Sequence, residues 1–481
     1  MAQEATAQPT THGAGCPDRA AFTAIAAFAA FAFMLIVPTS LNDGDTGWHL
    51  AAGAWIVEHG RVPTTDPFSF TAAGRAWVTH EWLAEAVMYA AYRAGGWSGL
   101  ILLFAAALAT LYALIARYIT RFLGMAGAAL ALAMMSVGLL PSLLARPHLL
   151  ALPLLAAWTI MLLDAGAAGR RPALPWAMLM LVWANAHGSF VLGLGLAASF
   201  ALEALVTAPV VARRRVVIDW GVFGLLCGAA ALVTPSGIHG LLFPFYVGNL
   251  ELLSQLTEWQ PADFSVFSGF ELILLATLFV LLVRPTRIPP VRLLILLGTL
   301  HLTLQHTRQE IVLVVLGALL LAEPIGTAWT RRRSRVFTES RAQAPALAIA
   351  LALAVGLAGY RLAVPVVRAD SATVPVTALR ALPADLRERP VFNEYSFGGS
   401  LILAGIRPFI DGRSDMYGDP FAMDYFAIAR GDAARWRAAE ARWRFGWTIL
   451  PPRSRLISLL DADPRWRRAH ADAVAVIHVR R

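Results

Sequence analysis

The sequence predicts an α-helical polytopic membrane protein that ends in an extracytoplasmic α/β domain. Hydrophobic residues make up 58% of the 481 residues, and the mean hydropathy is +0.60. Apolar runs of roughly 16 to 20 residues recur along the chain, about the length of a helix that crosses a bilayer. The basic residues, all 40 of them Arg, gather in the connections between these runs. This composition excludes a soluble enzyme.

Eleven apolar segments are expected to span the membrane, near residues 21–39, 98–116, 124–140, 148–164, 173–186, 189–208, 220–235, 269–283, 291–304, 310–325 and 344–362. Every second connection carries arginines, at 117 and 121, 170 and 171, 213–215, 284–292 and 331–335. The positive-inside rule makes this side cytoplasmic and places the C-terminal region in the periplasm of a bacterial inner membrane. The net charge of +9 therefore reflects topology and does not indicate nucleic acid as a partner.

The predicted organisation is a disordered cytoplasmic tail (1–19), a transmembrane domain (20–363) with a large outer loop (40–97), and a periplasmic α/β domain (366–481). The first apolar segment resembles a signal peptide, but its length and the tail before it favour an anchor. Cys16 in the tail and Cys227 in a span predict no disulfide.

The outer loop has its own predicted elements. Apolar residues at near-helical spacing between Trp48 and Val57, with Gly60 placed as a C-cap, predict an amphipathic helix on the membrane surface. A short strand-like piece at 68–71 and a second amphipathic helix at 77–92 follow. In the C-terminal region, strand-like runs (390–392, 408–410, 447–450 and 473–479) and helical ones (422–443 and 453–460) indicate a small α/β module.

Ionisable and polar residues gather at the outer ends of the predicted spans. They are Asp43, Asp45, His49, His80, Glu81, Glu85, Arg146, His148, Asn185, His187, His239, Glu258, His306, Arg308 and Glu310. A carboxylate can act as the general base on an acceptor hydroxyl, while Arg and His donors stabilise a departing phosphate. This set predicts a reaction on a membrane lipid that carries phosphate at the outer interface.

The two aspartates have more than one reading. Asp43 and Asp45 suit catalysis, and they equally suit capping of the helix that follows. As a metal signal the Asp43-Gly44-Asp45 triplet is weak, and a divalent cation held there would be Mg, Mn or Zn.

Simpler structural roles also exist for the other polar residues. Arg146 and His148 would serve as interfacial anchors, His187 would satisfy backbone groups in a short turn, and His80 would pair with Glu81. In the C-terminal region, residues 393–399 and 409–415 either contact a substrate or form tight turns. A local ion pair of Asp411 with Arg413 is favoured.

The first-loop motifs resemble those of the GT-C membrane glycosyltransferases. They are Asp43-Gly-Asp-Thr-Gly-Trp-His-Leu50, the helix end at 53–63, the turn at 66–70 and the segment 77–82. Together with 183–190 and 393–415, they are similar to the bacterial branch with an RgtA/B/C/D-like or family-39-like domain. Relatives usually carry an Asp-Glu pair where this chain has Asp45-Thr46, and the WWDYG-type signature of oligosaccharyltransferases is absent.

The resemblance implies an enzyme that transfers a hexose or pentose, with inversion, from a polyprenyl-phosphate donor to a glycan, lipid or protein acceptor at the periplasmic face. Asp45 would be the general base and Asp43 its partner or a metal ligand. The remaining candidates would bind substrate: His49, His80, Glu81, Arg146, His148, Asn185, His187, His306 and Arg308. A transporter of lipid carriers or polysaccharides and a non-catalytic scaffold for envelope assembly are the alternatives.

Overall fold

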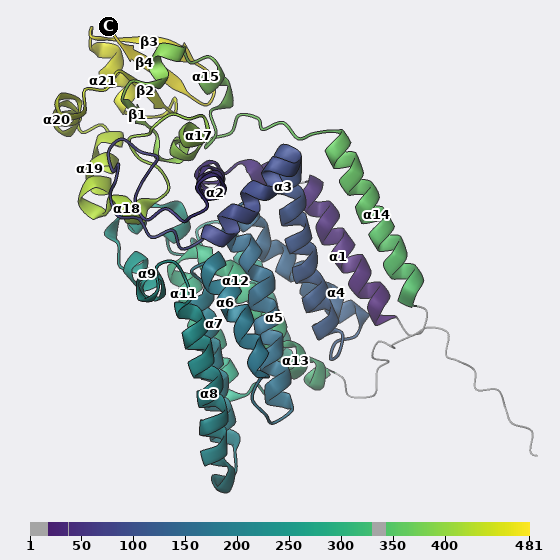
Figure 1. The fold of residues 1–481 in the computed structure, drawn as a ribbon. Helices are drawn as coiled ribbons and strands as arrows, with labels where there is room; N and C mark the ends of the chain where they lie inside the picture. The colour runs from purple at the N-terminus through teal and green to yellow at the C-terminus, as the bar shows by residue number, and fades with distance from the viewer. Residues whose placement is uncertain (1–17, 37, 330–342) are drawn as a thin grey trace, which may run out of the picture.

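The structure, a computed structural model, describes residues 18–36, 38–329 and 343–481 (Figure 1). A bundle of long helices carries a small C-terminal domain at one end, and the described strands all belong to that domain. The predicted fold class, a polytopic helical protein with a C-terminal α/β domain, is confirmed. The predicted tail, Cys16 and the arginines at 331–335 lie outside the described residues.

Each of the eleven predicted spans corresponds to a helix of the bundle. The helices are α1 (Arg19–Ile36), α3 (Trp82–Ile119), α4 (Met125–Leu139), α5 (Pro147–Ala167), α6 (Ala177–Ala186), α7 (Phe190–Thr207), α8 (Arg213–Leu232), α9 (Ile238–Gly248), α10 (Gly269–Val283), α11 (Pro290–Gln305), α12 (Glu310–Leu320), α13 (Ala322–Trp329) and α14 (Gln343–Ala363). In the described part of the chain, seven segments are long and apolar enough to cross a membrane alone, and the bent pair α12 and α13 makes an eighth. The predicted spans at α6, α10 and α11 are shorter helices, and α9 was not predicted.

The two ends of the bundle differ in charge. Helix α5 begins directly after Arg146, and α7 begins three residues after His187, so these two side chains lie near one end. The arginines at 170, 171 and 213–215 follow α5 and α7 and therefore lie at the other end. There Arg121 pairs with Asp164 of α5. Among the described residues, the predicted separation of arginine groups from the outer polar residues is thus present.

Helix α2 (Thr46–His59) is the predicted loop helix, and it ends at Gly60 in the left-handed conformation as expected. It does not lie on the membrane surface, however. Its side chains are buried on several faces, because α2 is held between α3 of the bundle and α17 of the C-terminal domain (Figure 1). Glycines permit this: a Cβ on Gly53 would lie 2.1 Å from the Glu85 carbonyl oxygen, and one on Gly47 2.2 Å from that of Gly399.

Two other loop predictions were wrong in detail. Residues 68–71, all described, form no strand; an isolated bridge joins Thr65 and Ala76 instead. The second amphipathic helix begins at Trp82, not at residue 77, and runs on into the next span as α3. Gly95 and Gly96 have non-helical backbone angles and break α3 between its interfacial and membrane-spanning parts.

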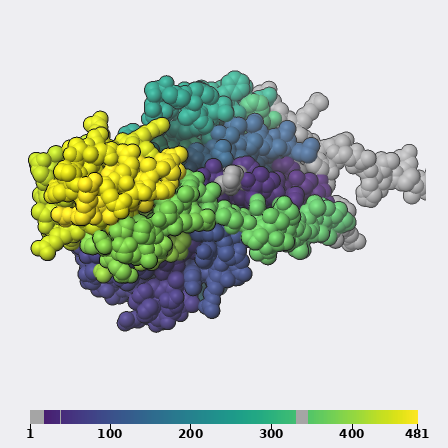
Figure 2. Space-filling model, turned by 90° about the horizontal axis from the view of Figure 1, so that it is seen from above, coloured from purple at the N-terminus to yellow at the C-terminus, as the bar shows by residue number. Residues whose placement is uncertain are grey.

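The C-terminal domain contains a four-stranded sheet with the order β1-β2-β4-β3, in which β1 and β2 are parallel and the other pairs antiparallel. The strands are β1 (Val391–Asn393), β2 (Trp447–Leu450), β3 (Trp466–Ala471) and β4 (Val476–Arg480). Helices α15 (Val376–Arg380), α16 (Ala384–Arg387), α17 (Gly398–Leu403), α18 (Ser414–Tyr417), α19 (Asp419–Ala429), α20 (Ala433–Trp443) and α21 (Leu456–Ala462) surround it. Seen from above, the domain covers one part of the bundle end, while α14 lies at the edge (Figure 2).

Three predictions for this domain need correction. Residues 408–410 form no strand, because the amide of Asn393 holds them by side-chain bonds to Phe409 and Ile410. The predicted helix at 422–443 is two helices, since Gly431 adopts a positive φ between them. Strand β3 was missed because it is polar and mostly exposed, which hides the alternation typical of a strand.

Candidate active site

Asp43 lies in the short segment between α1 and α2 and is 3% exposed. Its Oδ2 accepts hydrogen bonds from the backbone N–H and the hydroxyl of Thr46, both at 3.1 Å. Arg368, in the linker after α14, donates to the Asp43 carbonyl oxygen at 2.6 Å. Asp43 therefore satisfies a donor in the first turn of α2, as the capping interpretation expected, while its Oδ1 faces Arg146.

Arg146 joins three carboxylates from distant parts of the chain. Its Nη2 lies 2.6 Å from Oδ1 of Asp43 and 2.9 Å from Oδ2 of Asp45, and its Nη1 donates to Glu258 at 3.1 Å. Arg308 donates to the other oxygen of Glu258 at 3.2 Å. We call this set of five residues the arginine cluster. Two guanidinium groups and three carboxylates alternate within it, which is the arrangement that stabilises buried charge.

The two aspartates differ in pKa because their surroundings differ. Burial would raise the pKa of Asp43, but Arg146 outweighs it and lowers that pKa to about 2. Burial raises the pKa of Asp45 to about 7, because Asp43 and Glu258 add to its effect and Arg146 only partly opposes it. One carboxylate is thus permanently ionised, whereas the other exchanges its proton near neutral pH.

The C-terminal domain covers Asp45. A Cβ on Gly412 would lie 1.9 Å from Asp45 Oδ1 and 2.9 Å from Trp48 Nε1, so only glycine fits against this carboxylate. Tyr395 is close by: its pKa lies well above the usual range because of burial and the Asp45 charge. Residues of both motifs singled out in this domain, 393–399 and 409–415, therefore border the candidate base.

The predicted ion pair of Asp411 with Arg413 is present and fully buried. Arg413 donates to both oxygens of Asp411 at 2.8 and 2.7 Å and to Asp66 of the outer loop at 2.6 Å. Tyr417 donates to the same Asp411 carboxylate. This network ties the outer loop to the C-terminal domain, so its first role is to hold Gly412 and Asp45 in register.

A second group of polar residues surrounds Glu81, and we call it the histidine cluster. His80 Nε2 and His187 Nε2 lie 3.5 and 3.3 Å from Glu81 Oε1, while His49 Nδ1 lies 3.9 Å from Oε2. His49 also lies 3.2 Å from Glu85 Oε1. The predicted pairing of His80 with Glu81 is therefore present.

The imidazoles of this cluster differ: those of His49 and His187 are neutral, whereas for His80 burial is outweighed by the Glu81 charge, which raises the pKa of His80 above its usual value. Burial lowers the pKa of His49 to about 3 and that of His187 to about 4, against the opposing charge of Glu81. Burial would raise the pKa of Glu81, but His80, His187 and His49 lower it below its usual range. Glu81 is therefore ionised at neutral pH.

The remaining predicted residues lie around these clusters. His148 donates from Nε2 to the Ser142 carbonyl oxygen at 2.9 Å, and His306 donates from Nδ1 to the Trp259 carbonyl oxygen at 2.9 Å. Among the described residues, His306 forms no hydrogen bond or ion pair with the side chains of either cluster and lies at the edge of the site. Its neighbour Arg308 belongs to the arginine cluster and also lies over the Trp259 ring, 4.5 Å from its centroid.

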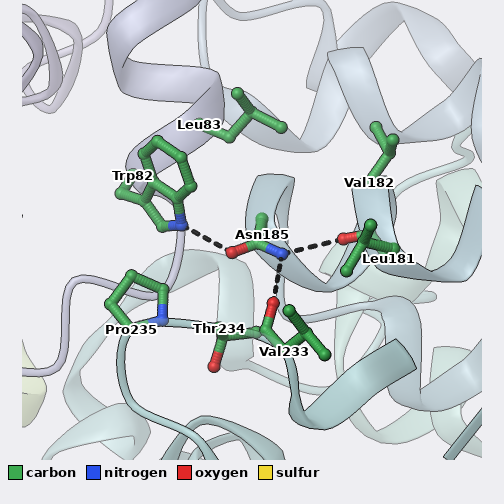
Figure 3. Close-up of a pocket in the computed structure, with 8 residues that line it drawn as sticks. All are labelled: Trp82, Leu83, Leu181, Val182, Asn185, Val233, Thr234 and Pro235. Carbon is green, nitrogen blue, oxygen red and sulfur yellow. Dashed lines mark hydrogen bonds between the residues drawn. The ribbon is translucent and has the colours of Figure 1, made fainter. Parts of the chain in front are cut away.

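Asn185 lines an apolar groove beside the histidine cluster (Figure 3). Its side chain accepts from Trp82 Nε1 at 2.7 Å and donates to the carbonyls of Leu181 and Val233. The groove has a volume of about 470 Å³, is open to one side, and is otherwise lined by Leu83, Val182, Thr234 and Pro235. Asn185 is thus a structural link between α3, α6 and the end of α8.

Sequence reasoning assigned no role to Glu258 or Arg368, which are both part of the site. Glu258 was identifiable only as an acid on the outer side, since nothing local pairs it with Arg146. The glycines at 44, 47, 399 and 412 suit turns, whereas here they permit backbone contact between α2 and the C-terminal domain. The sequence did carry one indication of this contact, because these glycines occur in two polar motifs that lie far apart in the chain.

Asp43 and Asp45, the predicted metal-ligand candidates, are both paired to Arg146. The oxygens of Asp43 and Asp45 that face each other are paired to Arg146 at 2.6 and 2.9 Å, and Glu258 is paired to both arginines. A divalent ion there would lie against a guanidinium group. Arg146 already supplies the positive charge that a metal would bring.

Comparison with known proteins supports the fold. The chain matches no known protein family and no curated protein. Among solved structures it is similar to the oligosaccharyltransferase of Archaeoglobus fulgidus in the apo form, with a TM-score of 0.55, 10% identity, and coverage of 89% of this chain and 69% of that one. It is equally similar to AglB, the oligosaccharyltransferase of the same archaeon, in complex with an inhibitory peptide and a dolichol-phosphate (TM-score 0.55, 11% identity, coverage 88% and 69%). The chain therefore shares the fold of this archaeal oligosaccharyltransferase.

Proposed function

We propose that this multi-pass membrane protein is a glycosyltransferase that uses a polyprenyl-phosphate-linked sugar donor, with Asp45 as the general base. The observation that carries the proposal is the pair of aspartates held by one arginine, with a pKa of about 2 for Asp43 and about 7 for Asp45. A base is most useful when its pKa lies near the working pH. Asp43 is too weak a base for this task.

The reaction would begin at the acceptor hydroxyl. Asp45 takes the hydroxyl proton while the oxygen forms a bond to the anomeric carbon of the sugar. The bond between that carbon and the phosphate oxygen breaks, and the phosphate leaves with the electron pair. Attack from the face opposite the leaving group inverts the anomeric centre.

The departing phosphate needs positive charge beside it. Arg146 and Arg308 would provide it, because a guanidinium group pairs readily with phosphate oxygens. Both arginines are only partly exposed, at 21% and 34% for their side chains, so their fields are weakly screened by water. In this proposal the arginines stand in for a divalent cation at Asp43 and Asp45.

The lipid of the donor would lie in the apolar groove of Figure 3. Trp82 and Asn185 line this groove, and their sequence neighbours Glu81 and His187 belong to the histidine cluster. The similar archaeal enzyme was captured with a dolichol-phosphate, which is a lipid of the same chemical class. The positive-inside rule puts this end of the bundle at the periplasmic face.

Mass spectrometry of envelope glycans in a deletion strain tests the proposal. The strain is complemented with the wild type, with Asp45→Asn, or with Asp263→Asn, a control aspartate that is exposed on the same outer side. We expect one sugar to be missing in the deletion strain and restored by the wild type and the control only. Full restoration by Asp45→Asn would exclude Asp45 as the base. Unchanged glycans in all strains would favour the scaffold or transporter alternatives.

A further inference from the structure

We propose that His49, Glu81 and Glu85 form a binding site for one divalent transition-metal ion, of which zinc fits best. The site lies beside the arginine cluster and shares no residue with it. The inference is independent of the proposed transferase reaction, because it rests on three side chains to which that reaction assigns no chemical step.

The backbone brings these three side chains together. Glu81 immediately precedes α3 and Glu85 lies in its first turn, so the two carboxylates, four residues apart, lie on one face. His49 comes from α2, which crosses α3 where Gly53 meets the Glu85 carbonyl. No residue larger than glycine fits at that crossing, so the approach of His49 to Glu85 is built into the packing.

The distances match a compact ion site. The three ligand atoms lie within 4.8 Å of one another. His49 Nδ1 is 3.2 Å from Glu85 Oε1 and 3.9 Å from Glu81 Oε2. Ligands at about 2.0–2.1 Å from a tetrahedral zinc ion are separated by about 3.3 Å. The separation of His49 from Glu85 already matches this value, and the Glu81 oxygen would have to move closer to His49.

Glu85 provides the independent observation that points to a ligand. It is 1% exposed, and its Oε2 has no hydrogen-bond partner among the described residues. A buried carboxyl oxygen without a partner costs free energy, and burial with the nearby Glu81 charge opposes the ionised form of Glu85 that a metal ion would bind. A divalent cation between the two glutamates removes both penalties at once.

The ligand chemistry favours zinc over magnesium. One imidazole and two carboxylates suit zinc, which binds nitrogen and oxygen ligands in tetrahedral sites, whereas magnesium prefers oxygen alone. His80 and His187 contact the other oxygen of Glu81 at 3.5 and 3.3 Å. These imidazoles would hold Glu81 in position, as residues outside the coordination sphere do in metal sites.

Metal analysis of the full-length protein, purified in detergent, tests the site. The protein is treated with a chelator, incubated with zinc, dialysed and measured by mass spectrometry for bound metal. We expect about one zinc per chain for the wild type and for Asp45→Asn, and a loss of about tenfold or more for His49→Ala and Glu85→Gln. Glu58→Gln and His59→Gln, at exposed positions on the same helix α2, are matched controls and should keep the metal.

Zinc retained at the wild-type level in Glu85→Gln, or its absence from folded wild-type protein, would overturn the proposal. X-ray absorption spectroscopy of the zinc-loaded wild type uses no variant, so its result does not depend on whether a variant folds. It should show only nitrogen and oxygen ligands at about 2.0–2.1 Å, and a sulfur ligand would place the ion elsewhere. The zinc site and the transferase reaction can fail independently. If Asp45→Asn loses sugar transfer but still binds zinc, the two proposals have been tested separately.

Discussion

The arginine cluster and the histidine cluster meet at the start of α2, where Asp45 precedes the helix and His49 lies in its first turn, and they neutralise buried carboxylates in different ways. In the first, Arg146 bridges Asp43, Asp45 and Glu258, so permanent positive charge balances the acids. In the second, Glu81 is surrounded by His80 and by the neutral imidazoles of His49 and His187, and one oxygen of Glu85 has no hydrogen-bond partner among the described residues. The arginine cluster is therefore suited to binding a phosphate and to accepting a proton, whereas the histidine cluster is suited to binding a metal ion.

The largest effect is expected for Arg146→Met. The substitution leaves three carboxylates without their common partner, which costs about 3–5 kcal/mol when a buried ion pair loses one member. Sugar transfer should fall below detection, and the melting temperature should drop. Arg121→Met, which removes an ion pair with Asp164 at the other end of the bundle, is the control. Comparable losses in both variants would mean that Arg146 has no special role.

Asp45→Asn should come next. Loss of a general base costs about a hundred- to ten-thousand-fold in rate. The melting temperature should change little or rise, because the neutral amide removes a charge that burial disfavours. The transfer rate and the melting temperature are measured for purified Asp45→Asn and for the control Asp263→Asn. A lower rate at an unchanged melting temperature indicates the loss of a base and not misfolding. A fall of less than about tenfold would argue against Asp45.

The pH dependence follows from Asp45 and has opposite signs for rate and stability. Because the base must be ionised, the transfer rate should rise about tenfold per pH unit up to a pH of about 7 and then level off. The folded-state pKa of Asp45 lies above its unfolded value, so its contribution to stability is present in acid and is lost as the pH rises through about 7. In Asp45→Asn both dependences should disappear. A wild-type rate independent of pH from 5 to 7 would contradict the assignment.

The smallest effect is expected for Glu258→Gln. The side chain is 39% exposed, and its two oxygens share Arg146 and Arg308. Its removal takes one negative charge away from Asp45, so the pKa of Asp45 should fall and the rate profile should shift to lower pH. We expect a change of only a few-fold in the maximal rate. An unshifted profile would show that Glu258 does not act on Asp45.

The spans and their polar ends followed from the sequence, because apolar length and arginine placement are local properties that the bilayer itself selects. The helix α2 and its end at Gly60 were predictable from the helical spacing of its apolar residues and from the glycine that follows them, which are also local properties. Its burial was not, since Gly53 and Gly47 meet partners on α3 and α17 that only folding brings close.

The pairings within the site were decided by tertiary structure alone. Asp43 and Arg146 are 103 residues apart, and Arg146 and Glu258 are 112 apart, so no local pattern joins them. The residue types on the outer side were evident from the sequence by itself. Which of the two aspartates has the raised pKa was not, because the acidity of Asp45 depends on burial under Gly412 and on the charges that the folded bundle places around it.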